Sequence, residues 1–415
     1  MTMIIKRDYY LQQLISSKSN NLIKIVTGIR RSGKSFLLFN LFHNHLIETG
    51  ISEDHIIEIA LDDRLNKNLR DPDVILQHIH ERIVDDRLYY IILDEVQMID
   101  EFTDVLNSLL HIRNADVYVT GSNSKFLSKD VVTEFRGRGD EIHLFPLSFA
   151  ELYNSIGGDK FELWKSYYTY GGLPGILELD SEKKKAAYLR SLHETVYLKD
   201  IIERNNLKNS EEFMELMRVM ASCIGSPCNP SKLENTFKSV KNETLDRKTI
   251  SKYLSYMEDA FLIEKSTRYD IKGRKYIGTL SKYYFQDIGL RNALLNFRQV
   301  EENHIMENVI YNELRLRGFC VDVGMVEART AKERKQLEVD FVANMADRRY
   351  YIQSAFAMPD DDKREQECAS LKKIDDSFKK IIIMRDDIKP YHDNNGFYIV
   401  GLMDFLLKPD LIEQL

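Results

Sequence analysis

A short polar loop joins a run of apolar, strand-forming residues to an apolar helical pattern within residues 24–43. Its Gly28, Gly33, Lys34 and Ser35 fit the spacing G-x-x-x-x-G-K-[ST]. In this motif backbone N–H groups surround phosphate oxygens, the lysine reaches the β- and γ-phosphates, and the hydroxyl ligates Mg²⁺. The following helix N-terminus favours an anion. The predicted ATP-binding residues are Gly28, Ile29, Arg30, Arg31, Ser32, Gly33, Lys34, Ser35 and Phe36, with ATP and Mg²⁺ as cofactors.

The alternative for this loop is an ordinary glycine turn that leaves Lys34 in solvent. A second feature argues against it, because the apolar run at residues 88–97 ends in the acidic pair Asp94 and Glu95. Such a pair is typical of a Walker B site, in which Asp94 would help to hold Mg²⁺ and Glu95 would orient and deprotonate the attacking water. The pair could instead cap the next helix. Beside a phosphate loop, it predicts ATP hydrolysis rather than binding alone.

Polar residues also follow the apolar run at residues 115–124. Asn123 or Ser122 is the candidate for a side chain that senses the γ-phosphate or positions the water. The alternative is an ordinary turn, because Gly, Ser and Asn favour turns for local reasons.

Arg136 and Arg138 come directly before the apolar run at residues 140–148. In oligomeric ATPases an arginine at such a place can reach the γ-phosphate of a neighbouring subunit and contribute about 10³ to 10⁵ in rate. An arginine in a solvated loop is the alternative. The finger interpretation predicts a homo-oligomer.

The elements that must position these residues alternate along the chain. Apolar strand patterns at residues 55–63, 88–97, 115–124 and 140–148 are separated by helical patterns. This alternation predicts an α/β fold with a parallel sheet covered on both faces. Ligands of such sheets bind at the carboxyl ends of the strands, where the polar residues above are expected to meet.

Composition limits the remaining choices. At 415 residues the chain is longer than one ordinary domain. Its net charge of −7 provides no overall attraction to nucleic acid or to an anionic membrane. The four cysteines form no C-x-x-C pair, which argues against a zinc site and suits a reducing compartment. No signal peptide and no apolar run of about 20 residues is evident. We therefore expect a cytoplasmic protein without a membrane partner.

Taken together, the motifs resemble those of the prokaryotic AAA+ ATPases whose C-terminal half is a domain of unknown function. The resemblance covers nearly the whole chain and rests on the stretches GIRRSGKS, IILDEVQ, TGSNSKFLS, FRGRGDEIHLFPLSFAEL, YGGLPGIL, YLKDIIERNNL, ISKYLSYMEDAFLIEK and LSKYYFQDIGLRNAL, and on MENVIYNELRLRGF with LEVDFVA and YYIQSA. It implies an AAA+ P-loop ATPase core at 1–148, a helical lid at 149–222, a winged helix at 223–295 and a degenerate restriction-endonuclease-like α/β domain at 296–415.

The middle of the chain is consistent with this division. Residues 149–222 show helical rather than strand spacing. Residues 228–291 contain 13 Lys and Arg against 8 Asp and Glu, and predict two helices and a hairpin. A winged helix of this kind would place Thr249, Ser251 and Lys252 in a major groove of double-stranded DNA, with Arg268, Lys272, Arg274 and Lys275 on phosphates. Winged helices also make protein contacts, and the sequence leaves both partners open.

The resemblance to nucleases raises the question of a second activity. Restriction-type nucleases use a helical Glu, a strand Asp and a Glu/Gln-x-Lys motif to hold Mg²⁺ and align water. Glu307, Asp340 and Gln353 fit the first three positions, but the lysine position is Ala355. We therefore expect an inactive domain kept for recognition or assembly.

Two functions follow from the sequence. The first is an ATP-hydrolysing AAA+ protein that acts on or near DNA. The second is a nucleotide-switched scaffold that binds protein partners, in which hydrolysis resets the conformation.

Overall fold

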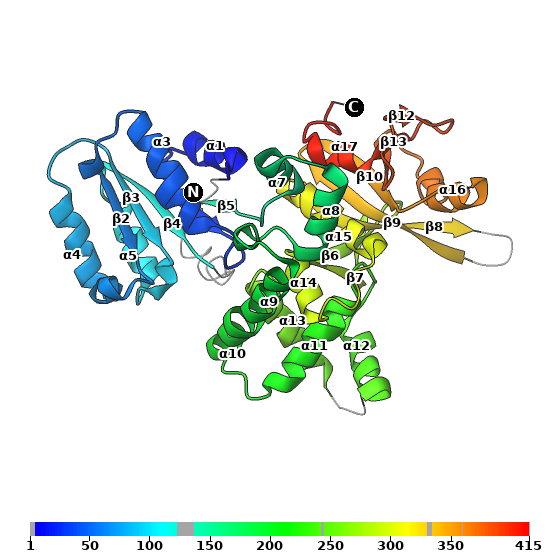
Figure 1. The fold of residues 1–415 in the computed structure, drawn as a ribbon, viewed down its shortest axis with the longest axis horizontal. Helices are drawn as coiled ribbons and strands as arrows, with labels where there is room; N and C mark the ends of the chain where they lie inside the picture. The colour runs from blue at the N-terminus through cyan, green and yellow to red at the C-terminus, as the bar shows by residue number, and fades with distance from the viewer. Residues whose placement is uncertain (1–4, 123–136, 242–244, 330–333, 359, 415) are drawn as a thin grey trace. The chain divides into compact units, whose positions relative to one another are not determined.

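A computed structural model of the chain describes residues 5–122, 137–241, 245–329, 334–358 and 360–414. The chain divides into two compact units (Figure 1). The first comprises Met1–Pro146, Leu173–Glu178 and Asp259–Phe261, and the second comprises Leu147–Gly172, Leu179–Glu258 and Leu262–Leu415.

The first unit is built on a five-stranded sheet in the order β2-β3-β4-β1-β5, in which every pair of neighbours is parallel. The strands are β1 (Ile23–Thr27), β2 (Ile56–Ala60), β3 (Tyr89–Asp94), β4 (Ala115–Thr120) and β5 (Gly139–His143). The α/β class and the parallel sheet are thus confirmed. Since β4 lies between β1 and β3, the residues that end these three strands are neighbours at one edge of the sheet.

Helices cover both faces of this sheet (Figure 1). On one face lie α1 (Asp8–Ser16) and a continuous helical segment made of α2 (Lys34–Phe36), the π-helical η1 (Leu37–Phe42) and α3 (His43–Glu48). On the other face lie α4 (Pro72–Arg82) and α5 (Phe102–Leu109). Alternate residues of β3 face opposite sides of the sheet. Tyr90 packs in the apolar cluster with α1 and α3, and Ile91 packs in the cluster with α4 and α5. The strands are therefore apolar throughout, as burial on both faces requires.

The second unit begins with helices, as the sequence predicts for residues 149–222. They are α7 (Phe149–Ile156), α8 (Lys160–Tyr170), α9 (Glu182–Leu192), η7 (His193–Leu198), α10 (Lys199–Asn205) and α11 (Ser210–Ser222). The start of α7 carries a capping box, in which Ser148 and Glu151 each accept a hydrogen bond from the backbone N–H of the other. Two further helices, α12 (Pro230–Thr236) and α13 (Arg247–Asp259), fall where the two helices of the winged-helix pattern are expected.

An eight-stranded mixed sheet forms the rest of the second unit, in the order β12-β13-β11-β10-β9-β8-β6-β7. Its strands are β6 (Ile263–Asp270), β7 (Lys275–Phe285), β8 (Cys320–Arg329), β9 (Arg334–Met345), β10 (Arg348–Ala355), β11 (Lys379–Met384), β12 (Tyr391–His392) and β13 (Tyr398–Gly401). The expected hairpin is β6–β7, and β6 also pairs in parallel with β8. The four-domain division stays a prediction, and the strands of its third and fourth domains share this one sheet.

One face of the large sheet is covered by α15 (Glu302–Leu316) and α17 (Leu402–Leu407), with α14 (Ile288–Leu294) and α8 nearby. Trp164 of α8 is 1% exposed and belongs to the same apolar core. Cys223, Cys228, Cys320 and Cys368 are free thiols. In the described ranges, no helix combines the length and apolar character needed to cross a membrane.

Candidate functional site

The loop between β1 and α2 has a backbone that only glycine suits at two positions. Gly28 has φ +137°, and a Cβ there would lie 2.2 Å from the carbonyl oxygen of Leu144. Gly33 has φ +98° and precedes the first helical residue, Lys34. Arg31 is also left-handed, at φ +66°. Left-handed residues within such a loop are typical of the backbone concavities that bind anions.

Lys34 is 5% exposed, and its Nζ atom donates hydrogen bonds of 3.1 Å to the carbonyl oxygens of Gly28 and Ile29. The ammonium group thus lies against the loop that the motif assigns to phosphate. Ser32 in the same loop is buried, and its Oγ atom has no hydrogen-bond partner among the described residues. A buried hydroxyl in this state is a ready donor for a phosphate oxygen.

Ser35 and Asp94 meet at the edge of the sheet. The Ser35 hydroxyl lies near the Asp94 carboxylate and lowers its pKa, and Thr120 Oγ1 donates a hydrogen bond to Asp94 Oδ1 at 2.5 Å. Asp94 is only 3% exposed, and burial raises the pKa of its carboxyl although both hydroxyls oppose the shift. The three residues come from the loop after β1 and from the ends of β3 and β4, which the strand order makes neighbours.

Glu95 follows Asp94 in a left-handed conformation, with φ +54°. Its backbone N–H donates to Thr120 Oγ1 at 2.8 Å, so one hydroxyl binds both members of the acidic pair. The Glu95 Oε2 atom accepts hydrogen bonds from Ser122 Oγ, at 3.0 Å, and from Gln97 Nε2. Both donors act on the same oxygen, so they hold the carboxylate, and among the described residues Oε1 is left for another partner.

The structure does not place every predicted residue at this site. Asn123 and Arg136 lie outside the described residues. Arg138 is described and exposed, and its backbone carbonyl accepts a hydrogen bond from the N–H of Ile23 at 2.9 Å. Phe36 is 37% exposed, although it directly follows the loop.

Sequence reasoning missed Arg7, which precedes α1. It is 4% exposed, its Nη2 atom donates to the carbonyl of Phe145 at 2.7 Å, and its Nη1 atom donates to the carbonyl of Ser32 at 3.4 Å. Arg7 thereby ties the phosphate loop to the segment after β5. A lone arginine before a helix offers no sequence signal for this, because its partners are distant in the chain.

In the second unit, three residues of the nuclease-like pattern lie near one another. The backbone N–H of Asp340 donates to Gln353 Oε1 at 3.4 Å, and the N–H of Ser354 donates to Asp340 Oδ2 at 2.9 Å. Glu307 is joined to Asp340 through Lys282, which interacts with both carboxylates. Ala355 is 1% exposed and packs in the apolar core.

The shared partner is Lys282 of β7, which the sequence analysis did not single out. Its Nζ atom lies 2.7 Å from Glu307 Oε1, 2.7 Å from Glu338 Oε1 and 3.7 Å from Asp340 Oδ1, and its side chain is 3% exposed. Burial lowers the pKa of Lys282, but the three carboxylates outweigh it and the net pKa is raised. A permanent positive charge therefore sits among these acids.

The same surroundings act on Asp340. Burial, and then the charge of Glu307, raise the pKa of Asp340 to about 7, while Lys282 opposes the shift. Tyr284 donates a hydrogen bond of 2.7 Å to Glu307 Oε1, the oxygen that also contacts Lys282. This carboxylate cluster is thus satisfied by groups of the chain itself.

Two known families match successive parts of the chain. The boundary between the two matches falls near the point where the structure changes from the five-stranded sheet to helices. Residues 20–153 match the family described as AAA domain. Residues 161–301 match a family described as a domain of unknown function (DUF8612). The phosphate loop, the acidic pair and the polar ends of β3 and β4 all fall within the first match.

Two solved structures show weak likeness to the chain. One is the Aeropyrum pernix ORC1 protein in complex with DNA, which is 13% identical with a TM-score of 0.32, and the match covers 71% of this chain and 93% of that chain. The other is Cdc6p from Pyrobaculum aerophilum, which is 12% identical with a TM-score of 0.31, and the match covers 74% of this chain and 97% of that chain.

Sequence relatives extend over the full length. An uncharacterized protein of *Methanocaldococcus jannaschii* is 29% identical over 407 residues, which cover 92% of this chain and 86% of that protein. An uncharacterized protein of *Haemophilus influenzae* is 33% identical over 414 residues, which cover 98% of this chain and 99% of that protein. The chain therefore belongs to the same family as this *Haemophilus influenzae* protein, and its N-terminal part contains an AAA domain.

Proposed function

We propose that the protein binds ATP at residues 28–36 and hydrolyses it. The observation that carries this proposal is that the Ser35 hydroxyl lies near the Asp94 carboxylate, because this brings the end of the loop at residues 28–35 to the acidic end of β3. Hydroxyl and carboxylate oxygens are ligands that Mg²⁺ accepts, so these two residues fit that ion. Mg²⁺ held there would neutralise charge on the phosphate oxygens.

Lys34 and Ser32 support the binding of the phosphates themselves. The Lys34 ammonium contacts two carbonyls of the loop, and phosphate oxygens would be stronger acceptors for it because they are charged. The buried Ser32 hydroxyl would gain the acceptor that it lacks among the described residues. The loop is thus prepared for an anion by its backbone and by two side chains.

Glu95 is the proposed general base. Ser122 and Gln97 fix its Oε2 atom, which leaves Oε1 to take a proton from the attacking water. Asn123 remains a candidate for positioning that water. Arg136 or Arg138 would complete the site of a neighbouring copy in a homo-oligomer, since an arginine finger supplied in trans stabilises charge in the transition state.

Two substitutions test the ATPase proposal. Lys34→Ala removes the ammonium, and we expect ATP binding to be lost. Glu95→Gln keeps the shape and removes the base, and we expect ATP binding to be retained while turnover falls by about 10² to 10⁴. Binding of a fluorescent ATP analogue and release of phosphate measure the two effects. Equal turnover by Glu95→Gln and the wild type would contradict the role of Glu95.

We also propose that the protein acts on or near double-stranded DNA through residues 228–291. Ser251 and Lys252 of α13 are exposed, as are Lys272 and Lys275 of the hairpin, so these side chains are available to phosphates. Stimulation of ATP turnover by duplex DNA, lost at high salt, is the expected result. No stimulation by DNA, together with stimulation by a protein partner, would favour the nucleotide-switched scaffold instead.

The C-terminal part is proposed to be nuclease-like and inactive. Lys282 supports this proposal, because its ammonium lies among the carboxylates where a nuclease would need a divalent cation. Incubation of plasmid DNA with the protein and Mg²⁺ or Mn²⁺ should give no cutting. Nicking that disappears in Asp340→Ala would show an active nuclease and contradict this part. The free cysteines are consistent with a cytoplasmic location, which we also propose.

A further inference from the structure

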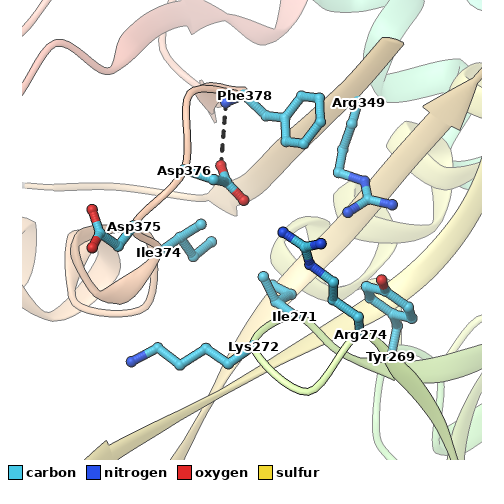
Figure 2. A pocket seen from close by; sticks show the side chains of 9 residues that line it. All are labelled: Tyr269, Ile271, Lys272, Arg274, Arg349, Ile374, Asp375, Asp376 and Phe378. Carbon is cyan, nitrogen blue, oxygen red and sulfur yellow. Dashed lines mark hydrogen bonds between the residues drawn. The ribbon is translucent and has the colours of Figure 1, made fainter. Parts of the chain in front are cut away.

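A cavity of about 570 Å³ opens in the second unit, at the turn of the β6–β7 hairpin. It is formed by that turn, by the start of β10 and by the loop that precedes β11 (Figure 2). Small-molecule sites in proteins have volumes of about 300 to 1,000 Å³. The cavity is therefore large enough for a ligand of nucleotide size, and it is distinct from both the phosphate loop and the Lys282 carboxylate cluster.

Two guanidinium groups, those of Arg274 and Arg349, point into the same space of this cavity (Figure 2). Within the described ranges neither forms an ion pair with a carboxylate, although Arg349 Nε donates a hydrogen bond of 2.7 Å to Asn344 Oδ1, and Lys272 adds a third cation to the lining. Two like charges that converge repel each other unless an anion lies between them. A phosphate group suits such a pair, because guanidinium forks bind phosphate oxygens bidentately.

The carboxylates in the lining do not fill this role. Asp376 accepts hydrogen bonds from the Tyr351 hydroxyl, at 2.7 Å, and from the N–H of Phe378, at 3.2 Å. Asp375, Asp376 and Arg274 are exposed, whereas Arg349 is half-buried. With three cations against two acids, the lining keeps a positive balance.

Aromatic rings also line the cavity, so it can contact an apolar ring of a ligand as well as an anion. The Arg349 guanidinium carbon lies 5.4 Å from the ring centre of Tyr269 and 5.2 Å from that of Phe378, so the two rings hold it in place. The Phe378 ring is 38% exposed and stands at the wall of the cavity (Figure 2). An exposed ring beside a phosphate-binding cation is the combination that binds a nucleobase together with its phosphate.

We propose that this cavity binds a nucleotide, with the phosphate on Arg274 and Arg349 and the base against Phe378. A free mononucleotide and the terminal nucleotide of a single strand share this chemistry. From the sequence alone, Lys272 and Arg274 are predicted to contact the phosphates of a DNA duplex. The site proposed here binds a single nucleotide instead. It needs neither ATP hydrolysis nor a groove-binding helix.

The test measures binding of three probes to the full-length protein: inorganic phosphate, thymidine 5′-monophosphate and a 5′-phosphorylated oligothymidylate. A Lys34→Ala background keeps the phosphate loop from contributing. Arg274→Ala and Arg349→Ala should each weaken binding of the two nucleotide probes at least tenfold. Phe378→Leu should weaken nucleotide binding about fivefold to tenfold more than it weakens phosphate binding, which corresponds to one lost stacking contact with the base.

Arg348→Ala is the matched control, because Arg348 precedes Arg349 on the same strand and forms its ion pair with Glu413, at 2.6 Å. Neighbouring side chains of a strand point to opposite faces, so this change should leave all three affinities unaltered. Binding of the mononucleotide identifies a free-nucleotide site, and binding of the oligonucleotide alone identifies a strand-end site. Absence of nucleotide binding, equal losses in Arg348→Ala and Arg349→Ala, or no effect of Phe378→Leu would overturn the proposal.

Discussion

The Ser122 hydroxyl donates a hydrogen bond to the Oε2 atom of Glu95 at 3.0 Å. Ser122 follows β4 and Glu95 follows β3, so the bond joins two strand ends that are separate in sequence and adjacent in the sheet. A glutamate in a loop has many rotamers, and this contact selects among them. The candidate base is thus positioned by a neighbouring strand as well as by its own.

Loss of this contact should slow ATP hydrolysis without preventing ATP binding. A hydrogen bond to a charged group contributes about 1.5 to 3 kcal/mol, so Ser122→Ala should lower turnover roughly tenfold or more. Phosphate release and nucleotide binding measure the two effects. Ser108→Ala is the control, because the Ser108 hydroxyl is exposed and bonds only to the Asp104 carbonyl in its own helix. An equal loss in both variants would argue against a role for Ser122.

Gly28→Ala should destabilise the first unit and abolish ATP binding. The added Cβ would lie 2.2 Å from the Leu144 carbonyl oxygen, so the loop must move. Gly50→Ala separates backbone strain from crowding, because Gly50 has φ +91° and a Cβ there meets nothing within 4 Å. We expect a cost of about 1 to 2 kcal/mol for Gly50→Ala, from the left-handed backbone alone, and a larger one for Gly28→Ala. Urea unfolding measures both, and equal costs would contradict the crowding argument.

Specific ATPase activity should rise with protein concentration if Arg136 or Arg138 completes the site of a neighbour. Arg136→Ala or Arg138→Ala should then reduce turnover by about 10³ or more while ATP binding persists. A mixture of an arginine variant with Glu95→Gln should recover activity, since one subunit supplies the base and the other the arginine. Full activity in a strictly monomeric protein would remove the finger hypothesis.

Lys282→Met should strongly destabilise the second unit. It removes the cation from the buried Asp340 and from the partly exposed Glu307 and Glu338, and removal of one partner from a buried ion pair costs about 3 to 5 kcal/mol. Lys238→Met, which breaks an exposed i,i+4 pair with Glu234, is the matched control and should cost less than about 1 kcal/mol. Equal unfolding free energies for the two variants would show that Lys282 does not balance these acids.

The raised pKa of Asp340 predicts a pH dependence of stability. The carboxyl titrates near 3.9 when unfolded and at about 7 in the folded protein. Between these values the folded state binds more protons than the unfolded state, so the free energy of unfolding contributed by Asp340 falls as pH rises from about 4 to 7 and is constant above. Asp340→Asn should flatten the dependence of the unfolding free energy on pH between about 4 and 7. Asp410 is exposed, and Asp410→Asn should leave this dependence unchanged. Parallel profiles for Asp340→Asn and the wild type would contradict the shift.

The conformation of the loop at residues 28–34 can be predicted from the sequence for a physical reason. Most of its contacts are made by backbone within eight residues, so spacing alone constrains the geometry of Gly28, Gly33 and Lys34. Asp94 is predictable for the same reason, because burial of a strand that ends in a carboxylate is a local pattern. The parallel sheet follows from repeated strand and helix periods.

Side chains that act across the chain are not predictable in this way. Arg7 reaches Phe145, and Lys282 reaches Glu338, only because the fold brings together segments that are distant in sequence. A search for the missing nuclease lysine near Ala355 could not find Lys282, since it belongs to β7 on the far side of β6, β8 and β9 in strand order. Gln97 was likewise missed, because its role depends on the conformation of Glu95.

The parallel pairing of β6 with β8 has a consequence for synthesis on the ribosome. Residues Arg268–Asp270 pair with Val323–Met325, which emerge more than fifty residues later. Until then β6 presents one unpaired edge, and an open strand edge invites association with other chains. A nascent or truncated chain that ends near residue 295 would carry this edge permanently. The pairing of this edge of the hairpin is therefore complete only after residues 323–325 have been synthesised.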